Sequence, residues 1–258
     1  MMNYIKSEFY RVSHNRGIYI LTVILAFLSF LQNAVLGWYG RKDSGFPYAT
    51  TSFSYSNLVA NPMLFCALGT IIGIILYEGN KKNGNLKNTI SFGIPRRKVF
   101  IGQCIVAAVS AVFSLFIVMS IYIVSAATLL EHTGPVVLMD LLTEIPAVFF
   151  IAVASLISGI ACIEAFEKDS VGIIVWLTIW FIIPKILFYL GFLSNFIRRI
   201  AMWMPANFLG SNVMSVNLTQ SITAWGTPEG MAKCFITGII GIVIFSLSGV
   251  MVLRKKEV

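Results

Sequence analysis

Side chains that could act in catalysis are few in this sequence of 258 residues, and their spacing matches no common catalytic motif. The two histidines, His14 and His132, lie far apart, and no HExxH, GxSxG or Gly-rich phosphate-binding motif occurs. The four cysteines form no CxxC pair and have no histidine near them in the sequence (Cys66, Cys104, Cys162 and Cys234). We therefore interpret the cysteines as small buried hydrophobic residues, and we expect no catalytic group, no metal site and no bound cofactor in this chain.

The composition predicts a protein built inside a lipid bilayer. Hydrophobic residues make up 57% of the chain and charged residues 12%, and the mean hydropathy is +0.84. A soluble core of this size does not need so much apolar surface. The net charge of +8 would suit a nucleic-acid-binding protein, but the basic residues flank apolar runs, as they do beside a membrane. We expect the bilayer, and not nucleic acid, to be the partner.

Six apolar runs are long enough to cross the membrane as helices, since about 20 residues span a hydrocarbon core of about 30 Å. They lead us to expect an all-α polytopic protein with a single transmembrane domain over 1–258. The charge-free window from Ile200 to Pro228 is interrupted by proline, glycine and asparagine, and we expect it to be part of an outer loop over 194–233. The six predicted spans cover about 17–38, 58–77, 99–130, 145–163, 171–193 and 234–253.

The distribution of basic residues predicts that both termini are cytoplasmic. With the N-terminus inside, 13 of the 19 lysines and arginines lie on the inner side, 5 lie on the outer side and Lys185 lies within a span. The loop after the third span carries Glu131, Asp140 and Glu144 and no basic residue, which suits the outer side. In these boundaries no acidic residue lies inside a span, which argues against a gradient-driven carrier.

The segment 1–16 has the pattern of an amphipathic helix. Ile5, Phe9 and Val12 fall on one helical face, while Ser7, Arg11 and His14 fall on the other. We expect this segment to lie along the membrane surface before the first span.

The loop 79–98, between the second and third spans, is the most informative part of the sequence. Leu86, Ile90 and Ile94 recur every four residues, which predicts a short amphipathic helix, and a Gly93-Ile94-Pro95 break and three consecutive basic residues follow. Such a helix can lie on lipid or dock into a groove of another protein. The alternative is a solvated basic connection that only fixes the topology.

The order of residues around this loop resembles the membrane subunits of type-2 ABC transporters, the ABC-2 permeases. The resemblance rests on Glu78, Gly84, Leu86, Phe92, Gly93, Pro95 and Arg96, with Gly102 opening the next span; Gln103 departs from the lysine that is frequent there. It implies a loop that docks as a coupling helix on a separate ABC ATPase subunit, which binds ATP and Mg²⁺, and a second permease subunit, the same or related. The ATPase-coupling residues implied are Glu78, Gly84, Leu86, Ile90, Phe92, Gly93, Ile94, Pro95, Arg96 and Arg97.

The string NTISFGIPRRKV also resembles the permeases of bacterial peptide-antibiotic (lantibiotic) export and immunity systems. This implies a multi-pass protein of the bacterial plasma membrane that exports a hydrophobic or amphipathic substrate, such as an antimicrobial peptide. Two alternatives remain: a membrane binding or sensor module that does not transport, and a gradient-driven carrier.

Two further groups of polar residues are candidate sites. Glu164, Glu167, Lys168 and Asp169 cluster in the short fourth loop, as a second cytoplasmic contact or as a solvated turn. Pro184 and Lys185 interrupt the fifth span. Lys185 can extend to the headgroups, lie on a substrate path, or mark the re-entrant hairpin after helix five that the ABC-2 resemblance implies.

Overall fold

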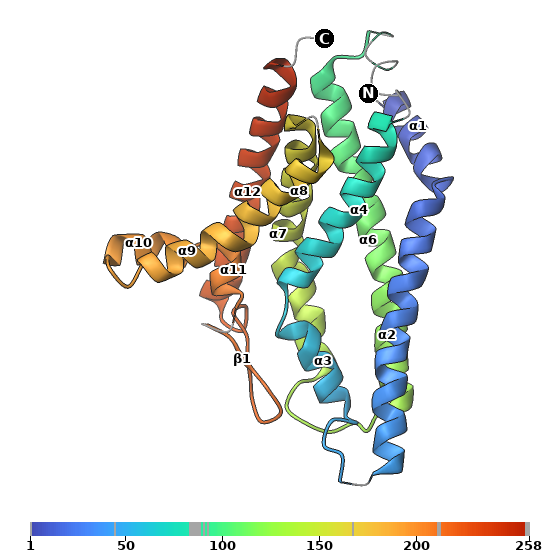
Figure 1. Ribbon diagram of the computed structural model, residues 1–258. Helices are drawn as coiled ribbons and strands as arrows, with labels where there is room; N and C mark the ends of the chain where they lie inside the picture. The colour runs from blue at the N-terminus through green and yellow to red at the C-terminus, as the bar shows by residue number, and fades with distance from the viewer. Residues whose placement is uncertain are drawn as a thin grey trace.

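The computed structural model describes residues 2–43, 45–82, 89, 91, 93–166, 168–210 and 213–255 as an elongated bundle of helices (Figure 1). The long helices run roughly along the bundle, and both ends of the chain lie at the same end of it. The helices are α1 (Met2–Ser13), α2 (Arg16–Lys42), α3 (Thr51–Val59), α4 (Met63–Lys82), α6 (Arg96–Leu129), α7 (Leu138–Ala165), α8 (Asp169–Leu177), α9 (Ile183–Leu190), α10 (Asn195–Ala201), α11 (Pro205–Phe208) and α12 (Pro228–Lys255).

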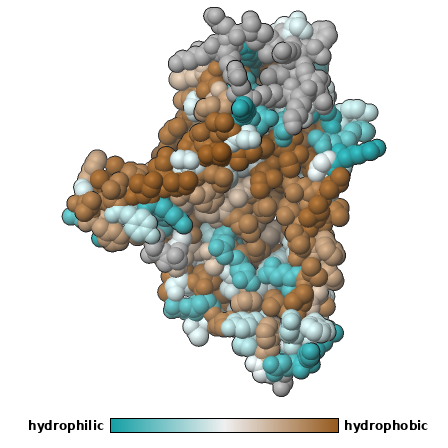
Figure 2. Space-filling model, viewed as in Figure 1, coloured by the Kyte–Doolittle hydropathy of each residue, from teal (hydrophilic) through white to brown (hydrophobic). Residues whose placement is uncertain are grey.

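Within the described residues, five helices are long and apolar enough to cross a membrane, and the number rises to six if the bent pair α3 and α4 counts as one span. Figure 2 shows hydrophobic residues over the middle of the visible face and hydrophilic ones toward the lower end. The predicted all-α, multi-pass architecture is therefore confirmed, although the second crossing is not a single straight helix.

The second predicted span, 58–77, is divided by a bend of 66° between α3 and α4. The break falls at Asn61 and Pro62, and proline has no N–H group to continue the helical bonding. Helix α3 begins with its own cap, because the Thr50 hydroxyl accepts a bond of 3.2 Å from the Phe53 amide. The turn at Asn61 and Pro62 therefore sets where α3 ends and α4 begins.

Helix α7 is the central helix and is longer than the predicted span 145–163. It packs against α4, α8 and α12, and its N-terminus is capped by the Asp140 carboxylate, which accepts a bond of 3.0 Å from the Val137 amide. Glu144 and Glu164 lie within this helix and are 1% and 4% exposed. The predicted boundaries 145–163 therefore stop short of both helix ends, because a charge-free window ends at each acid whereas the helix continues past it.

The fifth predicted span, 171–193, is not uniform. Helix α8 passes into a π-helical turn, η1 (Thr178–Ile182), and α9 continues to Leu190. The chain then turns and continues as α10, and α9 and α10 project away from the bundle (Figure 1). The region 194–233, predicted as an outer loop, contains α10, α11 and a small hairpin of β1 (Ser215–Val216) and β2 (Ser221–Ile222).

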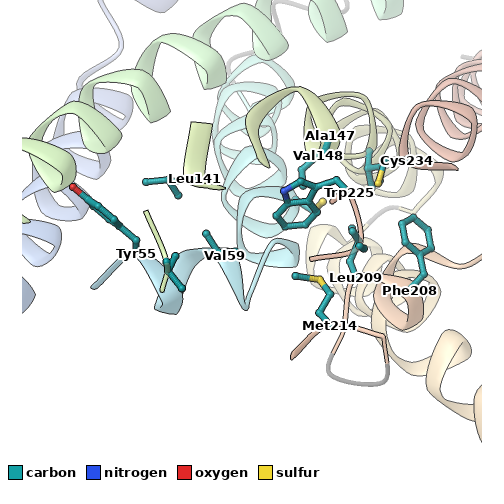
Figure 3. Packing of buried hydrophobic residues seen from close by; sticks show 14 of the residues in the cluster. Tyr55, Val59, Leu141, Ala147, Val148, Phe208, Leu209, Met214, Trp225 and Cys234 are labelled. Atoms are coloured by element: carbon teal, nitrogen blue, oxygen red, sulfur yellow. The ribbon is translucent and has the colours of Figure 1, made fainter. Parts of the chain in front are cut away.

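Among the described residues, the buried hydrophobic side chains form two clusters. Figure 3 shows one of them, in which Leu141 and Val148 of α7 lie near residues of α3 and of the segments before α12. The other cluster lies among α1, α4, α6 and α7, and it also includes Ile18 of α2 and Leu253 of α12. Cys66, Cys104 and Cys234 are buried, as the sequence interpretation expected, whereas Cys162 is partly exposed.

Candidate functional site

Four chain segments meet at one end of the bundle: α1, the end of α4, the start of α6 and the end of α12 (Figure 1). We call this the terminal end. The ATPase-coupling residues expected from the sequence fall here. Glu78, Gly93, Ile94, Pro95, Arg96 and Arg97 are described, whereas Gly84, Leu86, Ile90 and Phe92 lie outside the described residues, and with them most of the predicted amphipathic helix.

The start of α6 is shaped by a glycine and a proline. Gly93 has a φ of +83°, a conformation that L side chains rarely adopt, and Pro95 is the N-cap of α6. The Pro95 carbonyl accepts bonds of 2.8 Å from the Lys98 amide and 3.2 Å from the Val99 amide. This geometry leaves the side chains of Arg97 and Lys98 exposed beside the turn.

Arg96 connects the start of α6 to the last helix. Its Nη1 donates a bond of 3.2 Å to the carbonyl oxygen of Leu253 near the end of α12. A guanidinium at a helix C-terminus also interacts favourably with the helix dipole. The start of α6 and the end of α12 are therefore joined directly by a hydrogen bond.

Helix α1 packs onto α6. The Tyr4 ring lies against Gly102, where a Cβ would come within 2.8 Å of the ring, so this contact requires glycine. Ile5, Phe9 and Val12, the predicted apolar face, pack against the cluster among α1, α4, α6 and α7. The sequence pattern missed that Tyr4 is buried on the same side.

Polar groups of α1 are also buried at this contact. Glu8 is 6% exposed, and its carboxylate accepts a bond of 2.7 Å from the Arg11 guanidinium. Burial raises the pKa of the Tyr4 hydroxyl, and the nearby Glu8 carboxylate raises that pKa further. Glu8, Arg11, Tyr77 and Gln103 contribute to the lining of a cavity of about 10 Å³. Helix α1 is thus fixed to the bundle by polar as well as apolar contacts.

The second predicted contact, around the fourth loop, is divided by the structure. Glu164 lies inside the bundle, where its carboxylate accepts a hydrogen bond from the Tyr77 hydroxyl of α4, so it does not belong to an exposed surface. Lys168 is exposed and is the N-cap of α8, and Asp169 lies in the first turn, where the helix dipole favours an acid. Glu167 lies outside the described residues.

Pro184 and Lys185 lie at the start of α9 with different environments. Pro184 is buried, and its carbonyl oxygen accepts a bond of 2.8 Å from the Asn207 side chain, which fixes α9 to α11. Lys185 is exposed, and it lies three residues after the end of the π-helical turn. The structure therefore gives Pro184 a packing role and leaves Lys185 available at the surface.

Sequence reasoning missed Glu144, which it assigned to the edge of the outer loop. Leu141, Glu144 and Val148 recur at the spacing of one helical face, and this periodicity would have revealed that the helix starts before 145. Across the described residues no group of three or more His, Cys, Asp or Glu side chains could hold a metal ion.

Comparison with known proteins gives one family match. A model described as "ABC-2 family transporter protein" matches residues 4–185, which is 182 of the 258 residues. A search of curated proteins gives no match.

Proposed function

Because the chain belongs to the ABC-2 family of transporter membrane proteins, we propose that it is the permease subunit of an ABC transporter driven by a separate ATPase. In this proposal the chain contains the transmembrane path and the partner binds ATP and Mg²⁺. The observation that carries the proposal is the family match over both the amphipathic N-terminus and the 79–98 region. The terminal end supplies a surface where an ATPase could act.

The exposed basic turn at the start of α6 is our proposed docking surface, with Gly93, Ile94, Pro95, Arg97 and Lys98 as its described members. Its position is fixed from inside the protein, because Arg96 bonds to α12 and Gly102 contacts α1. A partner that pushes on this turn would therefore move three helices together instead of a flexible loop. Lys168 and Asp169 form the proposed second contact.

We propose that the terminal end faces the cytoplasm of a bacterial cell. The support is the excess of Lys and Arg that the sequence places on this side, next to anionic lipid and the energy supply of the cell. The described residues of one chain supply at most six crossings. A second permease subunit, the same or related, would complete the path, and ATP binding would switch the pair between two access states.

The proposed substrate is a hydrophobic or amphipathic molecule, such as an antimicrobial peptide, that is exported. This rests on the resemblance of the NTISFGIPRRKV string to lantibiotic export and immunity permeases. A membrane binding or sensor module would show the same fold without ATP-dependent flux. Transport in reconstituted vesicles separates the two, since only a permease moves substrate when ATP is added with the ATPase.

The docking surface can be tested by charge reversal of Arg97→Glu with Lys98→Glu. Both side chains are exposed, so the fold should be retained while co-purification of the ATPase and ATP-driven transport fall strongly. The matched control is Arg41→Glu, also exposed but at the opposite end of α2. If the double variant keeps full ATPase binding, the docking surface is assigned wrongly, although the family assignment still holds.

A second experiment concerns Lys185. If it lies on the substrate path, Lys185→Met lowers transport at a normal level of membrane insertion. Unchanged transport would leave only an interfacial or structural role for this side chain.

A further inference from the structure

A groove runs between α4, α6 and α7 on the side of the bundle. It encloses a cavity of about 180 Å³, and it opens between Val112 and Phe116 of α6 and Ile145 and Phe149 of α7, which are all exposed. This cavity is far larger than the roughly 10–15 Å³ that one water needs. The groove can therefore hold an organic molecule that arrives from the hydrocarbon region.

Glu144 is the one charged residue among the side chains that line this cavity. It is 1% exposed, and neither carboxylate oxygen has a hydrogen-bond partner among the described residues. The remaining lining is aliphatic, aromatic, methionine or glycine, from residues such as Phe65, Ala111, Met119 and Ala152. The site thus combines one hydrogen-bond acceptor group with walls that can only make apolar contacts.

The buried carboxyl group and the apolar walls together indicate what kind of molecule the groove can bind. A buried carboxyl group without a partner is costly, and a positively charged N–H donor removes that cost by forming a charge-assisted hydrogen bond. The apolar walls favour a hydrocarbon body. A neutral lipid chain would satisfy the walls but leave Glu144 unpaired, and an inorganic cation would satisfy Glu144 but gain nothing from the walls.

We propose that this groove is a binding site for a small lipophilic ammonium compound, with the Glu144 carboxylate as its counter-ion. The proposal does not depend on the coupling of this chain to an ATPase, because binding is a property of the permease alone. Failure of ATPase docking would leave it intact, and its own failure would leave the docking surface intact.

A matched pair of photoreactive probes tests the proposal on the purified full-length chain in lipid nanodiscs. One probe is an octylamine that carries a diazirine, and the other is the octanol with the same diazirine. After illumination, mass spectrometry locates the labelled peptides. We expect the amine to label peptides of α4, α6 and α7 around the groove, and unlabelled octylamine to compete for this labelling in a saturable way.

The variant Glu144→Gln keeps the shape of the side chain but removes its charge. It should lower labelling of the groove by the amine about tenfold, the factor that corresponds to about 1.4 kcal/mol, and should leave labelling by the alcohol unchanged. The matched control is Glu131→Gln, an exposed acid in the loop between α6 and α7, which should change neither. A filling variant, Ala152→Phe, should lower labelling of the groove by both probes.

Three results would overturn the proposal. In the first, the amine and the alcohol label the groove equally and Glu144→Gln changes neither labelling. This would indicate that lipid fills the groove. The second is labelling spread evenly over exposed apolar helices. The third is a groove protected from both probes in a dimer and labelled in the monomer, which would make it an interface between copies. Elution of each variant as a folded particle in size-exclusion chromatography accompanies every measurement.

Discussion

Asn33 of α2 and Glu144 of α7 are both almost completely buried, but the Asn33 side chain makes hydrogen bonds inside the protein whereas the Glu144 side chain has none among the described residues. Asn33 is 0% exposed; its Nδ2 donates bonds of 3.0 Å to the Tyr122 carbonyl and 2.8 Å to the Ser125 hydroxyl, and its Oδ1 accepts one of 2.7 Å from the Ser54 hydroxyl. Glu144 has no partner among the described residues. A polar group whose bonds are all made inside the protein fixes helices, whereas one left open is available to an outside molecule.

The Asn33 group connects three helices, α2, α3 and α6, at a depth where lipid offers no replacement hydrogen bonds. This explains how α2, which is mostly exposed and has few buried residues, is fixed to the bundle. The contrast with Glu144 predicts that stability and ligand binding depend on different buried polar residues.

The largest effect is expected for Asn33→Leu. It removes three hydrogen bonds and leaves the Ser54 and Ser125 hydroxyls to find other partners, so the free energy of unfolding should fall by about 2 kcal/mol. The measurement is reversible unfolding in mixed micelles. Thr128→Val, which removes an exposed hydroxyl bonded to carbonyls of its own helix, is the control and should change little. No loss for Asn33→Leu would contradict a structural role.

A smaller effect is expected for Tyr77→Phe, which turns Glu164 into a group more like Glu144. Loss of the hydroxyl donor leaves a buried carboxylate short of one bond, and the free energy of unfolding should fall by about 1.5 kcal/mol. Tyr189→Phe, at an exposed tyrosine of α9, should have no effect in the same assay. Equal stability of the two variants would show that the Tyr77 bond contributes nothing.

Ser54→Ala should cost about 1 kcal/mol, because it removes one of the three bonds of Asn33. Its effect should shrink when Asn33 is already leucine, since both changes remove the same bond. A double-mutant cycle measures this difference. Purely additive losses would mean that the two side chains act independently.

The smallest effect is expected for Glu144→Gln in the absence of any added amine. No bond inside the protein is broken and the unpaired buried carboxyl group is removed, so the free energy of unfolding should not fall. A fall in the free energy of unfolding as large as that for Asn33→Leu would show that Glu144 has a structural role, and it would contradict the proposed difference between the two residues.

The sequence was sufficient to predict a multi-pass protein of long apolar helices, because length and hydropathy decide which segments can cross a bilayer. Its boundaries for α7 stop short of the helix ends, because they were set at acidic residues. Glu144 and Glu164 lie inside α7, since a helix that packs centrally can bury an acid beside Tyr77 or a groove. Composition alone cannot show such neighbours.

The break in the chain before α6 was predictable from the sequence, but its contacts with distant segments were not. Gly93 and Pro95 are local signals, and they stand where the sequence placed the break before α6. The bond from Arg96 to Leu253 and the contact of Tyr4 with Gly102 join segments far apart in the chain, and no local pattern encodes them. The π-helical turn before Pro184 likewise has no composition signal.

The bond between Arg96 and Leu253 also has a consequence for biosynthesis. Its two partners are 157 residues apart in the sequence, so the start of α6 stays without this partner until the ribosome has made α12. Contacts of such separation form late, after the local helices have inserted. The terminal end would then close as one of the last steps of assembly, and a chain released before α12 would expose this unfinished end to quality-control proteases.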